Sequence, residues 1–132
     1  MYTIKCESSF DAAHFLSNYH GKCHNIHGHR WKILACIKGN LDNGMVADFS
    51  FLKSYLKELC DYFDHTFIVE RGSLENHILN SLKEQFVIRE VDFRTTAENF
   101  SKYFFEKVNE RYDCLYIEVY ETPNNSARYS CE

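Results

Sequence analysis

The sequence predicts an α+β fold, and three observations lead to that prediction. Two segments at the start of the chain alternate apolar with polar side chains, as half-buried strands do. Two later segments repeat apolar residues at intervals of three and four, as amphipathic helices do. Each of these helices has a single apolar face, so both can pack on one side of an antiparallel sheet.

The first two predicted strands lie near the N-terminus. Residues 2–10 alternate apolar with polar side chains. The second run starts at His29, ends at the turn residues Gly39 and Asn40, and presents one apolar face, formed by Trp31, Ile33, Ala35 and Ile37. His27 and His29 continue that face, because residues two apart project to the same side of a strand.

Two helices follow, and each shows one apolar stripe. The first begins at Ser50, which can cap its N-terminus, and its stripe consists of Phe51, Leu52, Tyr55, Leu56, Leu59, Cys60 and Phe63. The second opens at residues 96–99, and its stripe consists of Phe100, Phe104 and Val108. Polar residues occupy the other faces, so we expect each helix to bury one side only.

The last predicted strand, from Cys114 to Thr122, carries a carboxylate on its apolar face. Ile117 and Val119 define that face, and the next residue on it is Glu121. A buried ionised carboxylate is unfavourable unless hydrogen-bond donors surround it, so Glu121 should meet a cation of the protein or a ligand with paired N–H groups. In the alternative interpretation the strand has already ended and Glu121 is solvated.

Size and composition predict one domain, spanning residues 1–132. The formal net charge of −4 and the absence of a basic stripe argue against a nucleic-acid binder. The N-terminal residues do not form a signal peptide, and no segment is long enough to cross a bilayer, so we expect a cytoplasmic protein without a membrane partner. The aromatic content of 16% suggests apolar surface buried between subunits.

Three histidines form a candidate metal site. His27 and His29 share one face of a strand, and His14 can supply a third imidazole from the neighbouring segment. A structural zinc site normally has four protein ligands, whereas a catalytic site leaves one position open. Three imidazoles therefore favour a catalytic metal, and zinc suits them best, although copper, nickel or iron also accept nitrogen ligands.

Cys23 and the pair Asp64-His65 are the candidate proton-transfer groups. A thiol beside a dication has a lowered pKa and can act as a base or nucleophile, but Cys23 can instead be a fourth zinc ligand. A histidine oriented by a carboxylate is held in one tautomer and becomes a better base, as His65 can be beside Asp64. The alternative for this pair is an ordinary helix terminus.

Several short motifs stand at intervals along the chain: Phe10-Asp11-Ala12-Ala13-His14, Cys23 with three residues before His27-Gly28-His29, Asp48-Phe49, Asp64-His65, Thr96-Ala97-Glu98-Asn99 and Tyr120-Glu121-Thr122. In this order they resemble the motifs of the 6-pyruvoyl-tetrahydropterin synthase superfamily. The short gap between Cys23 and His27 resembles the branch that forms 6-carboxy-5,6,7,8-tetrahydropterin in queuosine and 7-deazaguanine biosynthesis. Two features depart from the pattern, namely the long connection over residues 76–93 and Thr95, which stands where a proline is common.

The resemblance implies a tunnelling fold, in which a four-stranded antiparallel sheet carries two helices on one face. It also implies assembly through trimers into a homohexamer, with active sites between subunits. Zn²⁺ would be bound by His14, His27 and His29. Cys23 would be the catalytic thiolate and Asp64 with His65 the proton relay. Glu121 would bind the pterin, and the same pocket would be bordered by Thr96, Ala97 and Glu98.

The reaction implied by the resemblance is that of a carbon-carbon lyase. The substrate would be 7,8-dihydroneopterin triphosphate, and the products 6-carboxy-5,6,7,8-tetrahydropterin, acetaldehyde and triphosphate. No nicotinamide or flavin is required, which agrees with the lack of a glycine-rich dinucleotide motif. Two alternatives stay open, namely 6-pyruvoyl-tetrahydropterin synthesis without carbon-carbon cleavage and a non-catalytic protein that binds zinc or pterin.

Overall fold

A long antiparallel hairpin is the frame of the structure. The computed structural model describes residues 1–131. Strands β1 (Tyr2–His14) and β2 (His27–Gly39) pair along their full length, from Tyr2 opposite Gly39 to His14 opposite His27. Strand β5 (Cys114–Thr122) pairs with β2, and β6 (Asn125–Ser130) pairs with β5, all antiparallel. The two N-terminal strands and the last strand predicted from periodicity are therefore present.

The sheet has more strands than the predicted four. Two short parallel strands, β3 (Thr66–Glu70) and β4 (Ile88–Val91), extend it beyond β1, so the strand order is β4-β3-β1-β2-β5-β6. The prediction of a purely antiparallel four-stranded sheet was incomplete, and the six-stranded sheet is mixed. Strand β3 meets β1 only at Ala12 and Ala13, and so short a pairing leaves no alternating pattern in the sequence.

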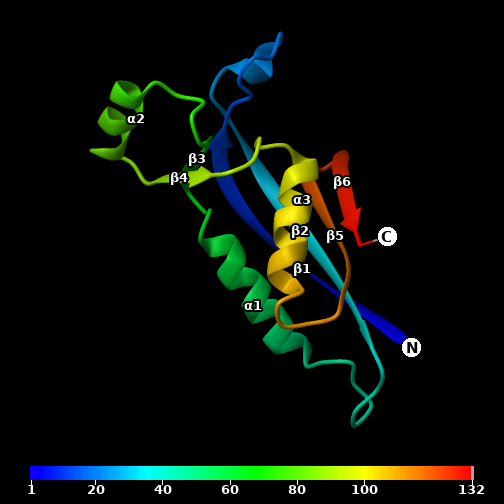
Figure 1. The fold of residues 1–132 in the computed structure, drawn as a ribbon. Coiled ribbons are helices and arrows are strands. Elements are labelled where there is room, and N and C mark those ends of the chain that lie inside the picture. Colours follow the sequence, from blue (N-terminus) through cyan, green and yellow to red (C-terminus); the bar gives the residue numbers. More distant parts are fainter. Residues whose placement is uncertain (132) are drawn as a thin grey trace.

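Three helices accompany the sheet instead of two (Figure 1). Helices α1 (Phe49–Asp61) and α3 (Ala97–Val108) lie side by side over one face of the hairpin. The additional helix α2 (Asn76–Lys83) lies apart from them, inside the long connection between β3 and β4. It has only 8 residues and buries only Leu79, so it lacks the long apolar stripe that located α1 and α3.

Aromatic side chains dominate the core between the sheet and the helices. Five rings pack with centroids 5.0 to 6.3 Å apart: Phe10, Trp31, Phe63, Phe100 and Phe104. Each such side chain stabilises the fold by about 1.5–3 kcal/mol when it is fully buried. The same face of β1 and β2 continues beyond Phe10 and Trp31 into His14 and His29, so the core ends where the histidines begin.

The N-termini of α1 and α3 differ in how well they were predicted. Asp48, not Ser50, caps α1, because its carboxylate accepts hydrogen bonds from the Ser50 amide at 2.7 Å and hydroxyl at 2.6 Å. The helix therefore starts two residues earlier, and Phe51 is 69% exposed instead of buried. Thr96 caps α3 as its position suggests, and its hydroxyl accepts the Asn99 amide hydrogen.

No helix within residues 1–131 combines the length and the apolar character that a membrane-spanning segment requires.

Candidate metal and pterin site

The three predicted histidines converge at one end of the β1–β2 hairpin. His14 is the last residue of β1, and the strand register sets His27 directly opposite it and His29 opposite Ala12. All three rings project to the face that carries the core, because they occupy alternate positions of the two strands. One ligand atom from each of His14, His27 and His29 lies within 4.8 Å of the others.

Hydrogen bonds to Nδ1 orient two of these rings. Nδ1 of His14 lies 2.9 Å from the Thr95 carbonyl oxygen, and Nδ1 of His27 lies 2.7 Å from the Asn25 carbonyl oxygen. A carbonyl can only accept, so each Nδ1 carries the hydrogen and each Nε2 is left for another partner. Within residues 1–131 the buried Nε2 atoms of all three histidines have no hydrogen-bond partner. This arrangement is typical of imidazoles that bind a metal.

The electrostatics also suit a cation. Burial lowers the pKa of His14 to about 4, with further lowering by the neighbouring His27 and His29 imidazoles. Burial likewise lowers the pKa of His29, although Glu121 acts in the opposite direction. His14 and His29 are therefore neutral at pH 7, which is the form that coordinates a metal. Three imidazole nitrogen donors fit zinc or a similar divalent ion.

The carboxylate of Glu121 faces two histidines of this cluster, His14 and His29. Strand β5 continues to Thr122, so Glu121 stays on the strand and its carboxylate does not turn away into solvent. Its Oε2 lies 3.7 Å from Nε2 of His14, and its Oε1 lies 3.9 Å from Nε2 of His29. These contacts are not ion pairs at neutral pH, since burial keeps His14 and His29 uncharged.

A cleft of about 270 Å³ runs from Glu121 to the N-terminus of α3. It brings together four residues that the sequence placed in one pocket: Thr96, Ala97, Glu98 and Glu121. Strand β6 adds three lining residues that the sequence analysis did not identify: Asn125, Ser126 and Ala127. The cleft is adjacent to the histidines because Glu121 belongs to both.

Cys23 lies on a short 3-10 turn, Lys22–His24, between the hairpin strands. Its side chain is half-buried, and its carbonyl oxygen accepts the Leu16 amide at 2.9 Å. Within residues 1–131 the group of atoms placed to share a metal contains the three histidines and not this thiol. The geometry therefore favours the three-imidazole set over a site closed by Cys23.

Asp64 and His65 form a hydrogen-bonded pair on the turn after α1. His65 Nδ1 lies 2.8 Å from Asp64 Oδ2, so the two neighbours do contact each other. Strand β1 holds the pair through the backbone of Asp11: its amide donates to Asp64 Oδ1 at 2.9 Å, and its carbonyl accepts the His65 amide at 2.6 Å. The Asp11 amide is the main reason that the pKa of Asp64 is lowered, so this carboxyl stays ionised.

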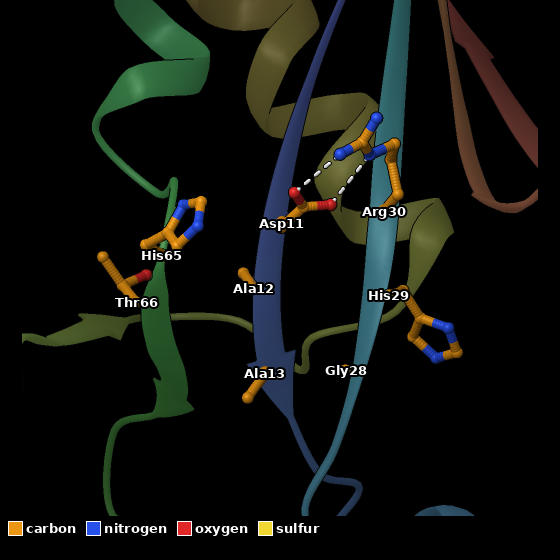
Figure 2. A pocket seen from close by; sticks show the side chains of 8 residues that line it. All are labelled: Asp11, Ala12, Ala13, Gly28, His29, Arg30, His65 and Thr66. Atoms are coloured by element: carbon orange, nitrogen blue, oxygen red, sulfur yellow. Dashed lines mark hydrogen bonds and ion pairs between the residues drawn. The ribbon is translucent and has the colours of Figure 1, made fainter.

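His65 lines a different cleft from Glu121. This cleft has a volume of about 400 Å³, and Figure 2 shows His65 beside β3 while His29 projects on the far side of β2. Arg30 bridges to Asp11 across the hairpin with two hydrogen bonds of 2.9 Å. No hydrogen bond or ion pair within residues 1–131 joins Asp64 or His65 to the three histidines. His29 and His65 nevertheless both line this cleft, so the relay pair and the histidine cluster lie near each other without a direct hydrogen bond.

Sequence analysis missed the residues that hold these groups. Thr95 orients His14 from 81 positions away, and Asp11 positions Asp64 from 53 positions away. The one available signal was the unusual threonine at position 95, which differs from the common proline. Arg30 could not be assigned from the sequence either, because its pairing with Asp11 depends on the hairpin register.

An α+β domain with three converging imidazoles has a site that could hold a metal ion. Comparison with known proteins is more specific. The family model described as 6-pyruvoyl tetrahydropterin synthase matches residues 3–132. The chain therefore belongs to the 6-pyruvoyl tetrahydropterin synthase family.

Individual relatives agree with this membership. The 6-carboxy-5,6,7,8-tetrahydropterin synthase of Haemophilus influenzae is 35% identical over 139 residues, which cover 98% of this chain and 99% of the relative. The Caenorhabditis elegans 6-pyruvoyl tetrahydropterin synthase structure superimposes with a TM-score of 0.72 at 27% identity, covering 99% of this chain and 96% of that one. An uncharacterized Wolinella succinogenes protein shares the fold at a TM-score of 0.83 and 20% identity, covering 99% and 98%.

Proposed function

We propose that this protein is a zinc-dependent 6-carboxy-5,6,7,8-tetrahydropterin synthase. It would convert 7,8-dihydroneopterin triphosphate and water to 6-carboxy-5,6,7,8-tetrahydropterin, acetaldehyde and triphosphate, as a carbon-carbon lyase of 7-deazaguanine and queuosine biosynthesis. The observation that carries the proposal is the shared position of Glu121, which faces the imidazoles of His14 and His29 and also lines the cleft at α3. The name of the Haemophilus influenzae relative supports the carboxy product.

The cleft residues would hold the pterin ring. A pterin presents a 2-amino group and a ring N–H side by side, and a carboxylate such as Glu121 accepts both hydrogen bonds at once. The N-terminal residues of α3, Thr96 to Glu98, line the same cleft and would fix the ring orientation. This placement would direct the substrate side chain toward the histidines.

His14, His27 and His29 would hold the zinc ion, which when bound supplies a Lewis acid that favours loss of a carbon-bound proton. The chain's own groups would carry that proton. Cys23, as a thiolate, is one proposed base, and its turn lies in the segment that joins β1 to β2. His65 is the other, because Asp64 holds its Nδ1–H and leaves Nε2 free to take or return a proton.

We further propose that the relay serves the metal of a neighbouring chain. His65 lines a different cleft from Glu121, and within residues 1–131 no hydrogen bond joins Asp64 or His65 to the histidines, so a complete site would draw on residues from two copies. A homohexamer built as a dimer of trimers in the cytoplasm would supply such pairs of copies. The aromatic surface predicted between subunits is consistent with this assembly.

Product analysis tests the reaction. Zinc-loaded protein is incubated with 7,8-dihydroneopterin triphosphate, and the products are identified by mass spectrometry. Acetaldehyde together with 6-carboxytetrahydropterin is the expected result. A pyruvoyl product would instead make the chain a 6-pyruvoyl-tetrahydropterin synthase, and no turnover by a zinc-replete, assembled sample would leave a binding protein.

A matched pair of cysteine variants tests the mechanism. Cys23→Ala should abolish turnover while zinc binding is retained, because the thiol is outside the imidazole cluster. Cys131→Ala removes an exposed thiol next to the C-terminus and should leave turnover unchanged. Full activity of the Cys23→Ala protein would contradict the proposed role of this thiolate.

A further inference from the structure

Strands β2 and β5 stop pairing before they reach the histidine cluster. The last pair at this end of the sheet is Lys32 with Tyr120, although both strands continue beyond it. A cleft of about 400 Å³ lies along this unpaired stretch, lined by residues 28–30, Lys32 and residues 120–123. Its lining includes His29 of the metal cluster and Glu121, which also lines the cleft at α3. The cleft between β2 and β5 therefore adjoins both the histidines and the cleft at α3.

Two cations line this cleft from β2. Arg30 and Lys32 alternate with His29 and Trp31 along the strand, so they project from the face opposite the histidines and lie about 6.8 Å apart along the chain. The Arg30 side chain is 72% exposed and the Lys32 side chain 41% exposed. Both cations can therefore meet a ligand that enters from solvent.

Neighbouring side chains hold both cations in place and leave donors unused. Asp11 accepts hydrogen bonds from Nε and Nη2 of Arg30 at 2.9 Å each, and within residues 1–131 Nη1 of Arg30 has no partner (Figure 2). Lys32 Nζ lies 4.2 Å from the centre of the Tyr120 ring and 3.8 Å from Glu7 Oε2, which is too long for a hydrogen bond. Because a guanidinium carries five N–H donors and an ammonium three, each can still bind an anion. Side chains that are already held lose little freedom when a ligand binds.

The two clefts differ in charge. Within residues 1–131 the charged residues that line the cleft at α3 are carboxylates, Glu98 and Glu121, and these repel a polyphosphate. The cleft between β2 and β5 has two cations, Arg30 and Lys32, beside the single carboxylate of Glu121. A substrate with an uncharged ring at one end and a triphosphate at the other therefore fits the pair of clefts in one direction only.

We propose that the cleft between β2 and β5 binds the triphosphate of the substrate, with Arg30 and Lys32 as the groups that hold it. The inference rests on the proposed function for the identity of the substrate. The ring would occupy the cleft at α3, the side chain would pass the histidines, and the triphosphate would lie against the two cations. Arg30 offers the free edge of its guanidinium to phosphate oxygens, and Lys32 offers a compact charge. Free triphosphate has the same chemistry, so it can serve as the probe.

Inorganic triphosphate tests the site without turnover. Its dissociation constant is measured by calorimetry with the full chain freed of metal, because triphosphate itself chelates zinc. Arg30→Gln and Lys32→Gln should each weaken binding by about tenfold or more, since each removes a hydrogen bond between charged groups. Arg111→Gln and Lys57→Gln are the matched controls: they remove exposed cations outside this cleft and should bind as the wild type does. A wild-type protein that does not bind triphosphate, or equal binding by all four variants, would overturn the inference.

Kinetics of the zinc-loaded protein separate the triphosphate from the rest of the substrate. Arg30→Gln and Lys32→Gln should each raise KM for 7,8-dihydroneopterin triphosphate by about tenfold or more, because the lost contacts bind the substrate before it reacts. Inhibition by 7,8-dihydroneopterin, which has the ring and the hydroxyls but no phosphate, should be unchanged. Zinc affinity, measured by chelator competition, should also be unchanged. An equal loss of 7,8-dihydroneopterin binding would place the effect at the ring or the metal and contradict the assignment.

The remaining outcomes separate this inference from the proposed function. Triphosphate binding that depends on Arg30 and Lys32, in a protein that forms no pterin product, would support the triphosphate site and contradict the synthase. Formation of the expected product with an unchanged KM in both variants would support the synthase and contradict the triphosphate site.

Discussion

Thr95 holds the imidazole of His14 with two oxygen atoms. The Thr95 carbonyl lies 2.9 Å and the Thr95 hydroxyl 3.0 Å from Nδ1 of His14, and both residues are 1% exposed. Thr95 directly precedes the N-cap of α3, so this contact links the cleft at the helix N-terminus to the histidine cluster. A hydrogen bond on one ring nitrogen sets the direction in which the other nitrogen binds a metal.

Replacing Thr95 by valine should weaken metal binding without destroying the fold. The variant loses the hydroxyl contact but keeps the carbonyl, so we expect zinc affinity to fall about tenfold and stability by about 1 kcal/mol. Competition with a chromophoric chelator measures the affinity. Thr66→Val is the control, because the Thr66 hydroxyl bonds to the Phe63 carbonyl away from the histidines; a similar loss of affinity there would refute the role of Thr95.

Removing a histidine of the cluster should remove the metal. His14→Ala eliminates one of three converging nitrogens, and zinc affinity should fall by more than about 100-fold, beyond the usual effect of a residue that only orients a ligand. His77→Ala changes an exposed histidine of α2 and should bind zinc normally. Equal affinity of the two variants, measured by the same chelator competition, would exclude the proposed site.

The metal-free protein should lose stability in mild acid. Burial holds the pKa of His14 near 4 and lowers that of His29, so the unfolded chain takes up protons first as the pH falls below about 6.5. Folding stability should therefore decline between about pH 6.5 and pH 4, before most carboxylates titrate. Urea denaturation at several pH values measures this slope, which should be shallower in His14→Gln; an unchanged slope would contradict the assignment.

Asp64→Asn should reduce turnover but not metal content. The amide no longer stabilises the tautomer of His65 that leaves Nε2 free, so we expect kcat to fall about 100-fold or more. Asp61→Asn is the control, because this exposed carboxylate pairs with Lys57 on α1. Loss of zinc in Asp64→Asn would show that the variant disturbs the fold instead of proton transfer.

Mixed assemblies test whether one site uses two chains. Cys23→Ala and His65→Ala should each be inactive, but an assembly containing both variants can form sites in which one chain supplies Cys23 and the other supplies His65. Activity should reappear when the two are refolded together and should be absent when either is refolded alone. Failure to recover activity in demonstrably mixed assemblies would place the relay within a single chain.

The local sequence was sufficient to predict many of the strands and helices and the direction of several site residues. Alternation along β1, β2 and β5 marked the buried faces, because a strand repeats its direction every two residues. The same rule put His27 and His29 on one side and turned Glu121 inward. Apolar spacing located α1 and α3, although the cap at Asp48 was misread as Ser50 because both residues favour that position.

Other features depended on tertiary structure. Strands β3 and β4 form through short parallel pairings that no local pattern encodes, and helix α2, with 8 residues, is too short to show a long apolar stripe. The hydrogen bonds from Thr95 to His14 and from Asp11 to Asp64 join residues far apart in the chain. Periodicity determines which face a side chain occupies, but strand register and chain topology decide what it meets there.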